Sequence, residues 1–257
     1  MVSKGRMKNF IALFLAIAML ILPAGIPASA AETTQNAPET EENADNFAEI
    51  RVEGHIEELD RRTVLDRLNE IREEACQEGV SNPVNGEPLR QEDYVPLEWS
   101  YELEKIAIQR AVESTILQDH VRPDGSECFS AAPEGVPFTM ETLAWGFGSA
   151  AAAIEGWYSE KAAYVDETGT PAGHYMALIN PENRLVGIAD FRADWQRDAC
   201  AGAFASHGEA GTGDTPQGQT ESLEWSIPLL RSYLPAVIER AVEVTARRIS
   251  AAARFGR

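Results

Sequence analysis

The chain has 257 residues, a length typical of one domain with appendages or of two small domains. Hydrophobic residues make up 44% and charged residues 25%, which excludes a wholly disordered chain, a collagen-like fibre and a polytopic membrane protein. With 22 Lys and Arg against 41 Asp and Glu, the net charge is −19. Because such a surface repels phosphate backbones and anionic lipid, we expect no nucleic-acid partner.

The first 30 residues have the three parts of a secretory signal peptide. Three basic residues within the first eight positions precede an apolar run over residues 10–22, and an Ala-Ser-Ala tripeptide ends at residue 30. The run is shorter than the roughly 20 residues that a membrane-spanning helix needs, which favours cleavage over an uncleaved anchor. We therefore expect a secreted, extracellular product with no integral membrane span once residues 1–30 are removed.

Composition divides the rest of the chain into four segments. Residues 31–62 are rich in acids and poor in aliphatics, which is typical of a disordered linker. Residues 63–206 carry the helix and strand patterns of a folded domain, and residues 207–224 are a Gly- and Thr-rich linker. Residues 225–257 contain six arginines, and residues 236–255 predict a basic amphipathic helix. That helix either docks on an anionic surface or on the acidic domain itself, or it frays.

Hydrophobic periodicity predicts the elements of the folded domain. The predicted elements are helices over residues 63–78, 100–117 and 148–164, a hairpin of strands over 175–179 and 185–191, and a last strand over 200–204. Both faces of the strands are apolar, so we expect helices to cover the sheet on both sides. This order of elements predicts an α+β sandwich.

Two histidines and two glutamates are the candidate functional residues. His120 follows the second predicted helix, Glu141 precedes the third, Glu160 lies on the third, and His174 opens the hairpin. Imidazole suits Zn²⁺ or another borderline divalent ion, and carboxylates either orient histidines or act as general bases. Because isolated His and Glu are more often surface or capping residues, these four alone are a weak metal signal.

Six short stretches add to that signal. They are LNEIR at residues 68–72, LEWS at 97–100, HVRPDG at 120–125, ETLAW at 141–145, WYSEK at 157–161 and GHYMALINP at 173–181. In this order they resemble the CAP superfamily, also called SCP-like, which includes cysteine-rich secretory proteins, plant pathogenesis-related proteins and bacterial extracellular relatives. The resemblance covers about residues 63–205.

The resemblance implies a three-layer α-β-α sandwich with a central antiparallel sheet and a cleft. It places the family tetrad on His120, Glu141, Glu160 and His174, of which the two histidines hold a divalent metal in some relatives, with Zn²⁺ the expected ion. Thr142 stands where relatives usually carry Asn, which puts the hydrogen bonding of that position in doubt. The sterol-binding loop and the cysteine-rich hinge of eukaryotic relatives have no counterpart, so lipid binding does not carry over.

Two classes of function fit these residues. The favoured one is a secreted binding or interaction module whose site takes a divalent cation or a small extracellular ligand, or contacts a cell-envelope component. The alternative is a metal-dependent, peptidase-like hydrolase with His120 and His174 as ligands and Glu141 or Glu160 as general base. A fold shared by many activities does not decide between them, and we lean towards a protein that is not an enzyme.

The chain carries three cysteines, an odd number for an exported protein. Cys76, Cys128 and Cys200 allow three different single bridges, and the sequence does not choose among them. A catalytic Cys–His pair with Cys128 is less favoured than a structural role, because Cys128 lies in a turn-rich loop. No Gly-x-Ser-x-Gly elbow supports serine catalysis.

Overall fold

A computed structural model describes residues 46–194, 198–211 and 223–241. The described residues fall into two units, a larger one of residues 53–122, 126–194, 198–211 and 223 and a smaller one of residues 46–52, 123–125 and 224–241. The expected signal peptide, positions 31–45 and 212–222 of the expected linkers, and positions 242–257 of the expected basic tail lie outside the described residues. Within the described ranges, no helix combines the length and the apolar character that crossing a bilayer requires.

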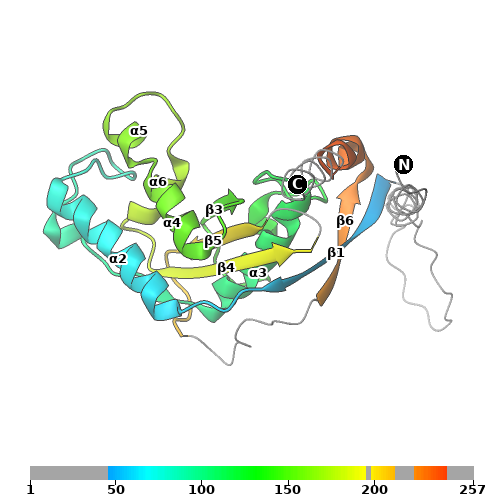
Figure 1. The fold of residues 1–257 in the computed structure, drawn as a ribbon. Coiled ribbons are helices and arrows are strands. Elements are labelled where there is room, and N and C mark those ends of the chain that lie inside the picture. Colours follow the sequence, from blue (N-terminus) through cyan, green and yellow to red (C-terminus); the bar gives the residue numbers. More distant parts are fainter. Residues whose placement is uncertain (1–45, 195–197, 212–222, 242–257) are drawn as a thin grey trace, which may run out of the picture. The chain divides into compact units, whose positions relative to one another are not determined.

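The larger unit contains most of the helices and strands (Figure 1). In chain order they are α2 (Arg61–Glu78), η2 (Gln91–Asp93), β2 (Glu98–Trp99), α3 (Tyr101–Ile116), η3 (Cys128–Ala131), β3 (Met140–Trp145), α4 (Ala150–Tyr158), α5 (Lys161–Val165), α6 (Gly173–Ile179), β4 (Leu185–Ala193) and β5 (Ala199–Ala205). Asp60 caps the start of α2, where its carboxylate accepts from two backbone amides, and Gly79 caps the end of α2 in the left-handed conformation.

The sheet of the larger unit is built around β4, which pairs antiparallel with β5 from Leu185 opposite Ala205 to Phe191 opposite Ala199. On its other side β4 pairs antiparallel with the end of β1 (Phe47–Ile56). The strand β3 pairs antiparallel with β5 and forms an end of the described sheet, while the short β2 runs parallel to β4. This arrangement confirms the predicted α+β fold with a central antiparallel sheet.

Alternate residues of β4 divide between two helical layers. Val186 and Ile188 belong to a core formed with α2, α4 and α6, whereas Gly187 lies against the main chain of α3. Since successive side chains of a strand point to opposite faces, α3 covers one face and the other three helices cover the opposite one. All positions of β4 from 185 to 191 and the whole of β5 are buried, as the apolar runs predict.

Three predicted elements differ from the structure. Residues 175–179, predicted as the first strand of a hairpin, lie in the helix α6, so that prediction is wrong; the apolar run is buried because α6 packs on the sheet and on α2 and α4. The predicted helix over residues 148–164 is divided into α4 and α5. Residues 47–56, which we placed in an acidic linker, form β1.

The smaller unit contains the first part of β1 and the strand β6 (Leu223–Leu230), which are neighbours in the sheet order. An ion pair of 3.6 Å joins Arg51 to Glu224, and the amide of Leu230 donates to the carbonyl of Pro123 at 2.8 Å. A short turn, η4 (Arg231–Tyr233), leads into helical residues 234–241. The rest of the predicted helix over residues 236–255 lies outside the described residues.

Candidate functional site

The fold brings the four candidate residues together beside β3. His120 follows α3, Glu141 lies in β3, Glu160 lies between α4 and α5, and His174 is the second residue of α6. The strand β3 forms an end of the sheet, so side chains from the α3 layer and from the α6 layer meet around it. The imidazole rings of His120 and His174 are 5.9 Å apart between centroids and tilted by 43°.

Each histidine is hydrogen-bonded to one glutamate through its Nδ1 atom. Nδ1 of His120 lies 2.6 Å from Oε2 of Glu141, and Nδ1 of His174 lies 2.6 Å from Oε1 of Glu160. A neutral imidazole paired with an ionised carboxylate, which only accepts hydrogen bonds, carries its proton on Nδ1 and keeps a lone pair on Nε2. Among the described residues, neither Nε2 has a hydrogen-bond partner, and the two rings are 52% and 24% exposed.

Glu160 is held by the start of α6 as well as by the His174 ring. Its Oε2 accepts from the backbone amides of His174 at 2.9 Å and Tyr175 at 3.2 Å. The indole of Trp157 lies 6.3 Å from the His174 ring between centroids, and its Nε1 donates to the carbonyl of Leu143 at 3.0 Å. The histidine ring is therefore fixed by a carboxylate anchored on backbone amides and by a buried aromatic neighbour.

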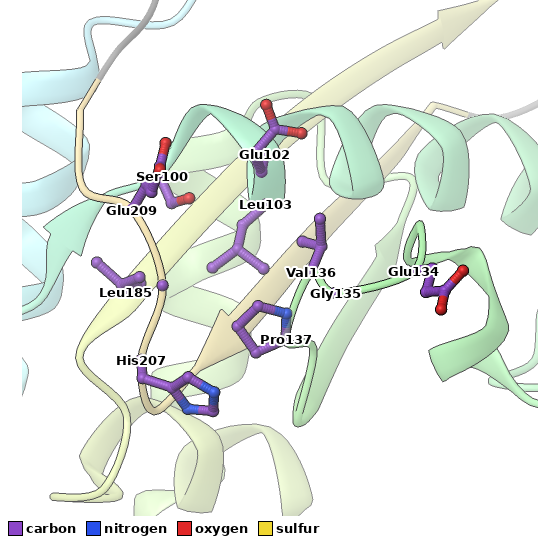
Figure 2. Close-up of a pocket in the computed structure, with 11 residues that line it drawn as sticks. Ser100, Glu102, Leu103, Glu134, Gly135, Val136, Pro137, Leu185, His207 and Glu209 are labelled. Carbon is purple, nitrogen blue, oxygen red and sulfur yellow. The ribbon is translucent and has the colours of Figure 1, made fainter.

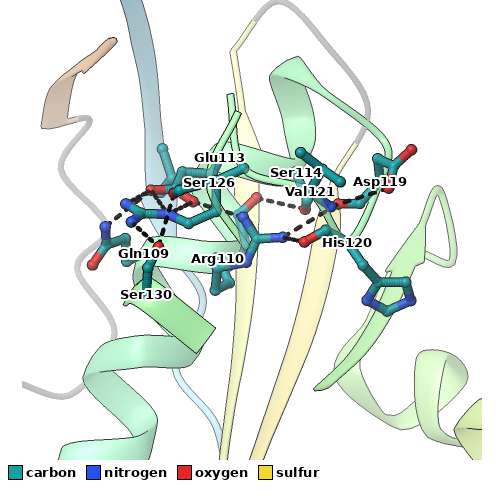
Figure 3. A network of polar contacts seen from close by, with 12 residues as sticks. Gln109, Arg110, Glu113, Ser114, Asp119, His120, Val121, Ser126 and Ser130 are labelled. Carbon is teal, nitrogen blue, oxygen red and sulfur yellow. Dashed lines mark hydrogen bonds and ion pairs between the residues drawn. The ribbon is translucent and has the colours of Figure 1, made fainter. Parts of the chain in front are cut away.

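Glu141 is held differently, by a buried arginine. Nε of Arg110 donates to Oε1 of Glu141 at 2.6 Å, and both side chains are almost fully buried, at 1% and 2% exposure. The same guanidinium donates to Glu113 at 2.6 Å (Figure 3). Glu113 also accepts from Arg122. Burial alone lowers the pKa of Arg110, but hydrogen bonds to the two glutamates outweigh it and raise that pKa.

The pKa of Glu113 is lowered in the same network. Burial raises this pKa, and the hydrogen bonds and charge of Arg122, with further bonds from Gln109 and Arg110, lower it by more. Glu113 is therefore ionised at neutral pH although only 3% of its side chain is exposed. Its charge lies between two arginines, which makes the buried carboxylate a fixed link between α3 and the segment after His120.

Arg110 and Glu113 are not among the residues that the sequence predicts for the site. One signal for Arg110 exists: Leu103, Ile106 and Ala107 form the buried stripe of α3, and residue 110 falls on the same stripe at helical spacing. A charged residue on a buried stripe needs a buried partner. That rule predicts an ion pair at this position but does not identify Glu141 as the partner.

The described residues contain no group of three or more His, Cys, Asp or Glu side chains arranged to hold a metal ion. The site instead offers two imidazole nitrogens, His120 Nε2 and His174 Nε2, with their glutamates bonded behind them. Two rings that share one Zn²⁺ at about 2.0 Å per Zn–N bond have centroids about 5 to 6 Å apart, so the separation of 5.9 Å fits this donor pair.

The sequence model of the cysteine-rich secretory protein family, CAP, matches residues 65–200, which is more than half of the chain. The chain belongs to this family. The matched range begins in α2 and ends in β5, so it contains every residue of the His/Glu tetrad. No curated protein sequence matches the chain.

Two solved structures are similar to this CAP domain. An outer surface protein from Borrelia burgdorferi is 19% identical, with a TM-score of 0.38 over 60% of this chain and 99% of that one. The crystal structure of NaASP2 with Zn²⁺ is 17% identical, with a TM-score of 0.39 over 62% of this chain and 86% of that one.

A separate cavity of about 320 Å³ lies at the first turn of α3 (Figure 2). Leu103, Pro137, Leu185 and the exposed His207 are among its lining residues, and it includes none of the tetrad. The segment after β5 that borders this cavity is tied to α3, because the amide of Tyr101 donates to the carbonyl of Gly211 at 2.9 Å.

The three cysteines of the CAP domain are buried thiols without a disulfide. Burial raises the pKa of Cys128 to about 11, with the charge of Glu141 adding to the effect, and burial also raises the pKa values of Cys76 and Cys200. A thiol with such a pKa is protonated at neutral pH and is a poor nucleophile. The chemistry at Cys128 therefore agrees with the structural role expected for it.

Proposed function

We propose that this CAP protein is a secreted binding module that binds a divalent cation and prefers Zn²⁺. The ligands are Nε2 of His120 and Nε2 of His174. The observation that carries the proposal is that both rings turn Nδ1 to a carboxylate, at 2.6 Å each, which leaves both Nε2 lone pairs for a cation. A carboxylate behind a metal-binding imidazole fixes its tautomer and makes it a better ligand.

The site supplies only two ligands from the described residues, whereas Zn²⁺ takes four in proteins. A bound Zn²⁺ would supply Lewis acidity and open coordination positions at which an anionic or carbonyl group of an extracellular ligand can bind. Imidazole nitrogen favours Zn²⁺ over Mg²⁺ and Ca²⁺, which prefer oxygen ligands. The exposure of the His120 ring leaves the site accessible to such a ligand, including one presented by the cell envelope.

The contacts favour binding over hydrolysis. Every carboxylate oxygen of Glu141 and Glu160 already accepts at least one hydrogen bond, from Arg110, from a histidine ring or from the backbone amides of α6. A general base needs an oxygen within hydrogen-bond reach of the reacting water. Since both glutamates are bound to the histidines instead, we assign them the role of orienting His120 and His174.

Calorimetric titration of the purified protein with ZnCl₂ in about 0.15 M salt tests this proposal, because salt at that concentration screens loose cation binding to an acidic surface. The test variant is the double substitution His120→Ala/His174→Ala. The chain has four histidines, so His55→Ala/His207→Ala removes the same number of imidazoles and serves as the matched control. Circular dichroism checks that both variants fold.

We expect the wild type and the control to bind one Zn²⁺ per chain with saturation, and the test variant to lose that binding. Titration with Mg²⁺ should give no saturable site in any of the three proteins. Equal Zn²⁺ binding by the two double variants, or the lack of a saturable site in the wild type, would overturn the proposal.

A further inference from the structure

Arg110 makes several hydrogen bonds beside the tetrad, although it is not part of it. All three nitrogens of the Arg110 guanidinium are used: Nε and Nη2 on Glu141, Nη1 on Glu113, and Nη2 also on two backbone carbonyls. Those carbonyls belong to Asp119 and His120 and lie at 3.2 Å each. The side chain of Arg110 is 1% exposed.

These bonds reach His120 along two routes. One route passes through Glu141, whose Oε2 holds the ring at Nδ1 and also accepts from Nη2 of Arg110 at 3.4 Å. The other holds the main chain of His120 itself. Figure 3 shows Arg110 beside the carbonyl of His120 while the imidazole points away from it. One planar guanidinium thus fixes both the backbone and the ring nitrogen of the same residue.

The arginine is itself held in a chain of alternating charges. Glu113 joins Arg110 at 2.6 Å to Arg122 at 2.6 Å, and Nη1 of Arg122 donates to the hydroxyl of Ser130 at 2.9 Å. With Glu141 the chain contains two positive and two negative groups, so its formal charge is zero. A buried set of charges needs this balance, because an unpaired ion in the interior is strongly destabilising.

We infer that Arg110 is the positioning residue of the site, which sets the tautomer and direction of the His120 ring. The inference rests on the proposed function only for its consequence in metal binding; its effect on the ring concerns the metal-free protein. His174 provides an internal comparison, because Glu160 and the backbone amides of α6 hold its ring without Arg110.

The test variant is Arg110→Lys, which keeps the positive charge but lacks the planar guanidinium that donates to two carboxylates and two carbonyls at once. The matched control is Arg61→Lys, because Arg61 makes an equivalent two-bond ion pair with the buried Glu104 at 3.1 and 2.8 Å, away from the tetrad. The readout is the ¹⁵N spectrum of the histidine side chains without metal at neutral to mildly basic pH, which distinguishes a protonated from an unprotonated ring nitrogen.

In the wild type and in Arg61→Lys we expect protonated Nδ1 and unprotonated Nε2 at both His120 and His174. In Arg110→Lys the signals of His120 should change to a mixture of tautomers while those of His174 stay unchanged. A general loss of packing would alter both rings. Retention of the wild-type His120 signals in folded Arg110→Lys would overturn the inference.

If Arg110→Lys does not fold, the double substitution Arg110→Gln/Glu113→Gln removes one charge of each sign and keeps the buried set neutral. The same change at His120 alone is expected, and its absence would again overturn the inference. As a second readout, Zn²⁺ affinity should fall by about tenfold or more in the folded variant, the usual effect of losing a partner behind a metal ligand. Should the wild type not bind Zn²⁺, the proposed function fails, and the tautomer result still decides the role of Arg110.

Discussion

Gly187 of β4 lies directly against the backbone of α3 at Glu104. A Cβ atom built on Gly187 would lie 2.0 Å from the amide nitrogen of Glu104 and 2.3 Å from the carbonyl carbon of Leu103. Because main-chain atoms of a helix do not move aside as a side chain does, only glycine allows this approach. The approach sets the depth of α3 on the sheet, and α3 carries Arg110, which contacts Glu141.

The first prediction is that Gly187→Ala destabilises the protein by about 3 kcal/mol or more, at or beyond the upper end for overpacking a core. Urea unfolding followed by circular dichroism measures this change. Gly173→Ala is the control, because a Cβ at Gly173 meets nothing within 4 Å, and it should alter the free energy of unfolding by less than about 1 kcal/mol. Equal stabilities of the two variants would contradict the close packing of β4 on α3.

The sequence predicts the long helices, whose apolar positions recur with a clear period, and two of the three apolar runs that we expected to be strands. The helices α2 and α3 and the strands β4 and β5 were expected within a few residues of their observed bounds. The helix α6 was mistaken for a strand because GHYMALI is short and apolar at most positions, and period alone does not separate a buried helix turn from a buried strand. Its helical form comes from packing against α2, α4 and β3.

The strand β1 was missed for a different reason. Its sequence FAEIRVEGHI alternates small or aliphatic residues with charged ones, and Ala48, Val52 and Gly54 are buried while Glu49, Arg51 and Glu53 are exposed. That alternation is a strand signal. Counting acids over the whole acidic segment concealed it, because composition carries no information about which face a charge lies on.

At the site, too, local sequence patterns predict some residues and miss those that depend on three-dimensional packing. Motifs alone brought His120, Glu141, Glu160 and His174 into one set, and the structure brings their side chains together. The motifs do not include Arg110. Its role depends on which helix layer faces β3, a relationship between distant segments that no local pattern contains.

The second prediction concerns Thr142, whose buried hydroxyl has no hydrogen-bond partner among the described residues. Replacing a buried unsatisfied hydroxyl with a methyl group of similar shape removes a desolvation cost, so Thr142→Val should leave the free energy of unfolding unchanged or raise it by about 1 kcal/mol. Thr115→Val is the matched control, because the equally buried hydroxyl of Thr115 donates to the carbonyl of Val112 at 2.8 Å. The control should lose about 1 kcal/mol. Similar losses in both variants, measured by thermal unfolding, would mean that the Thr142 hydroxyl has a partner.

The third prediction concerns Asp190, a carboxyl of β4 that is 3% exposed. Burial raises its pKa from 3.8 to about 6, and the nearby charge of Arg192 opposes part of this shift. Between the unfolded pKa of 3.8 and the folded pKa of about 6, the folded chain binds more protons than the unfolded chain. Ionisation of Asp190 therefore lowers the free energy of unfolding as pH rises from about 4 to about 6, and it has no further effect above about pH 6. Asp190→Asn removes that dependence.

We therefore expect Asp190→Asn to gain stability relative to the wild type as pH rises from 4 to 7. The amide oxygen can still accept a backbone hydrogen bond, and Arg192 keeps its ion pairs with Glu57 and Asp198 at 3.0 and 3.1 Å. Urea midpoints of both proteins at pH 4, 5, 6 and 7 provide the measurement. A difference between the two proteins that does not change across this range would show that Asp190 ionises alike in the folded and unfolded chains.

The fourth prediction tests how Glu160 orients His174. In Glu160→Gln the side-chain oxygen can still accept from the amides of His174 and Tyr175, which leaves the NH₂ group facing Nδ1 of the ring. Nδ1 then accepts a hydrogen bond, and the proton moves to Nε2, the nitrogen offered to the metal. If the proposed Zn²⁺ site is correct, affinity falls by about 10- to 100-fold while the fold is retained.

Glu155→Gln is the control for that substitution, since Glu155 lies on the neighbouring helix α4 and is half exposed in an ion pair with Arg67. It removes the same charge at a similar place and should leave Zn²⁺ affinity within about twofold, because an exposed charge is screened. The ¹⁵N spectrum of metal-free Glu160→Gln should show protonated Nε2 at His174 and unchanged nitrogens at His120, because Glu141 and Arg110 hold that ring independently. A His174 ring that keeps protonated Nδ1 opposite the glutamine would mean that the Glu160 carboxylate does not set the tautomer of this ring.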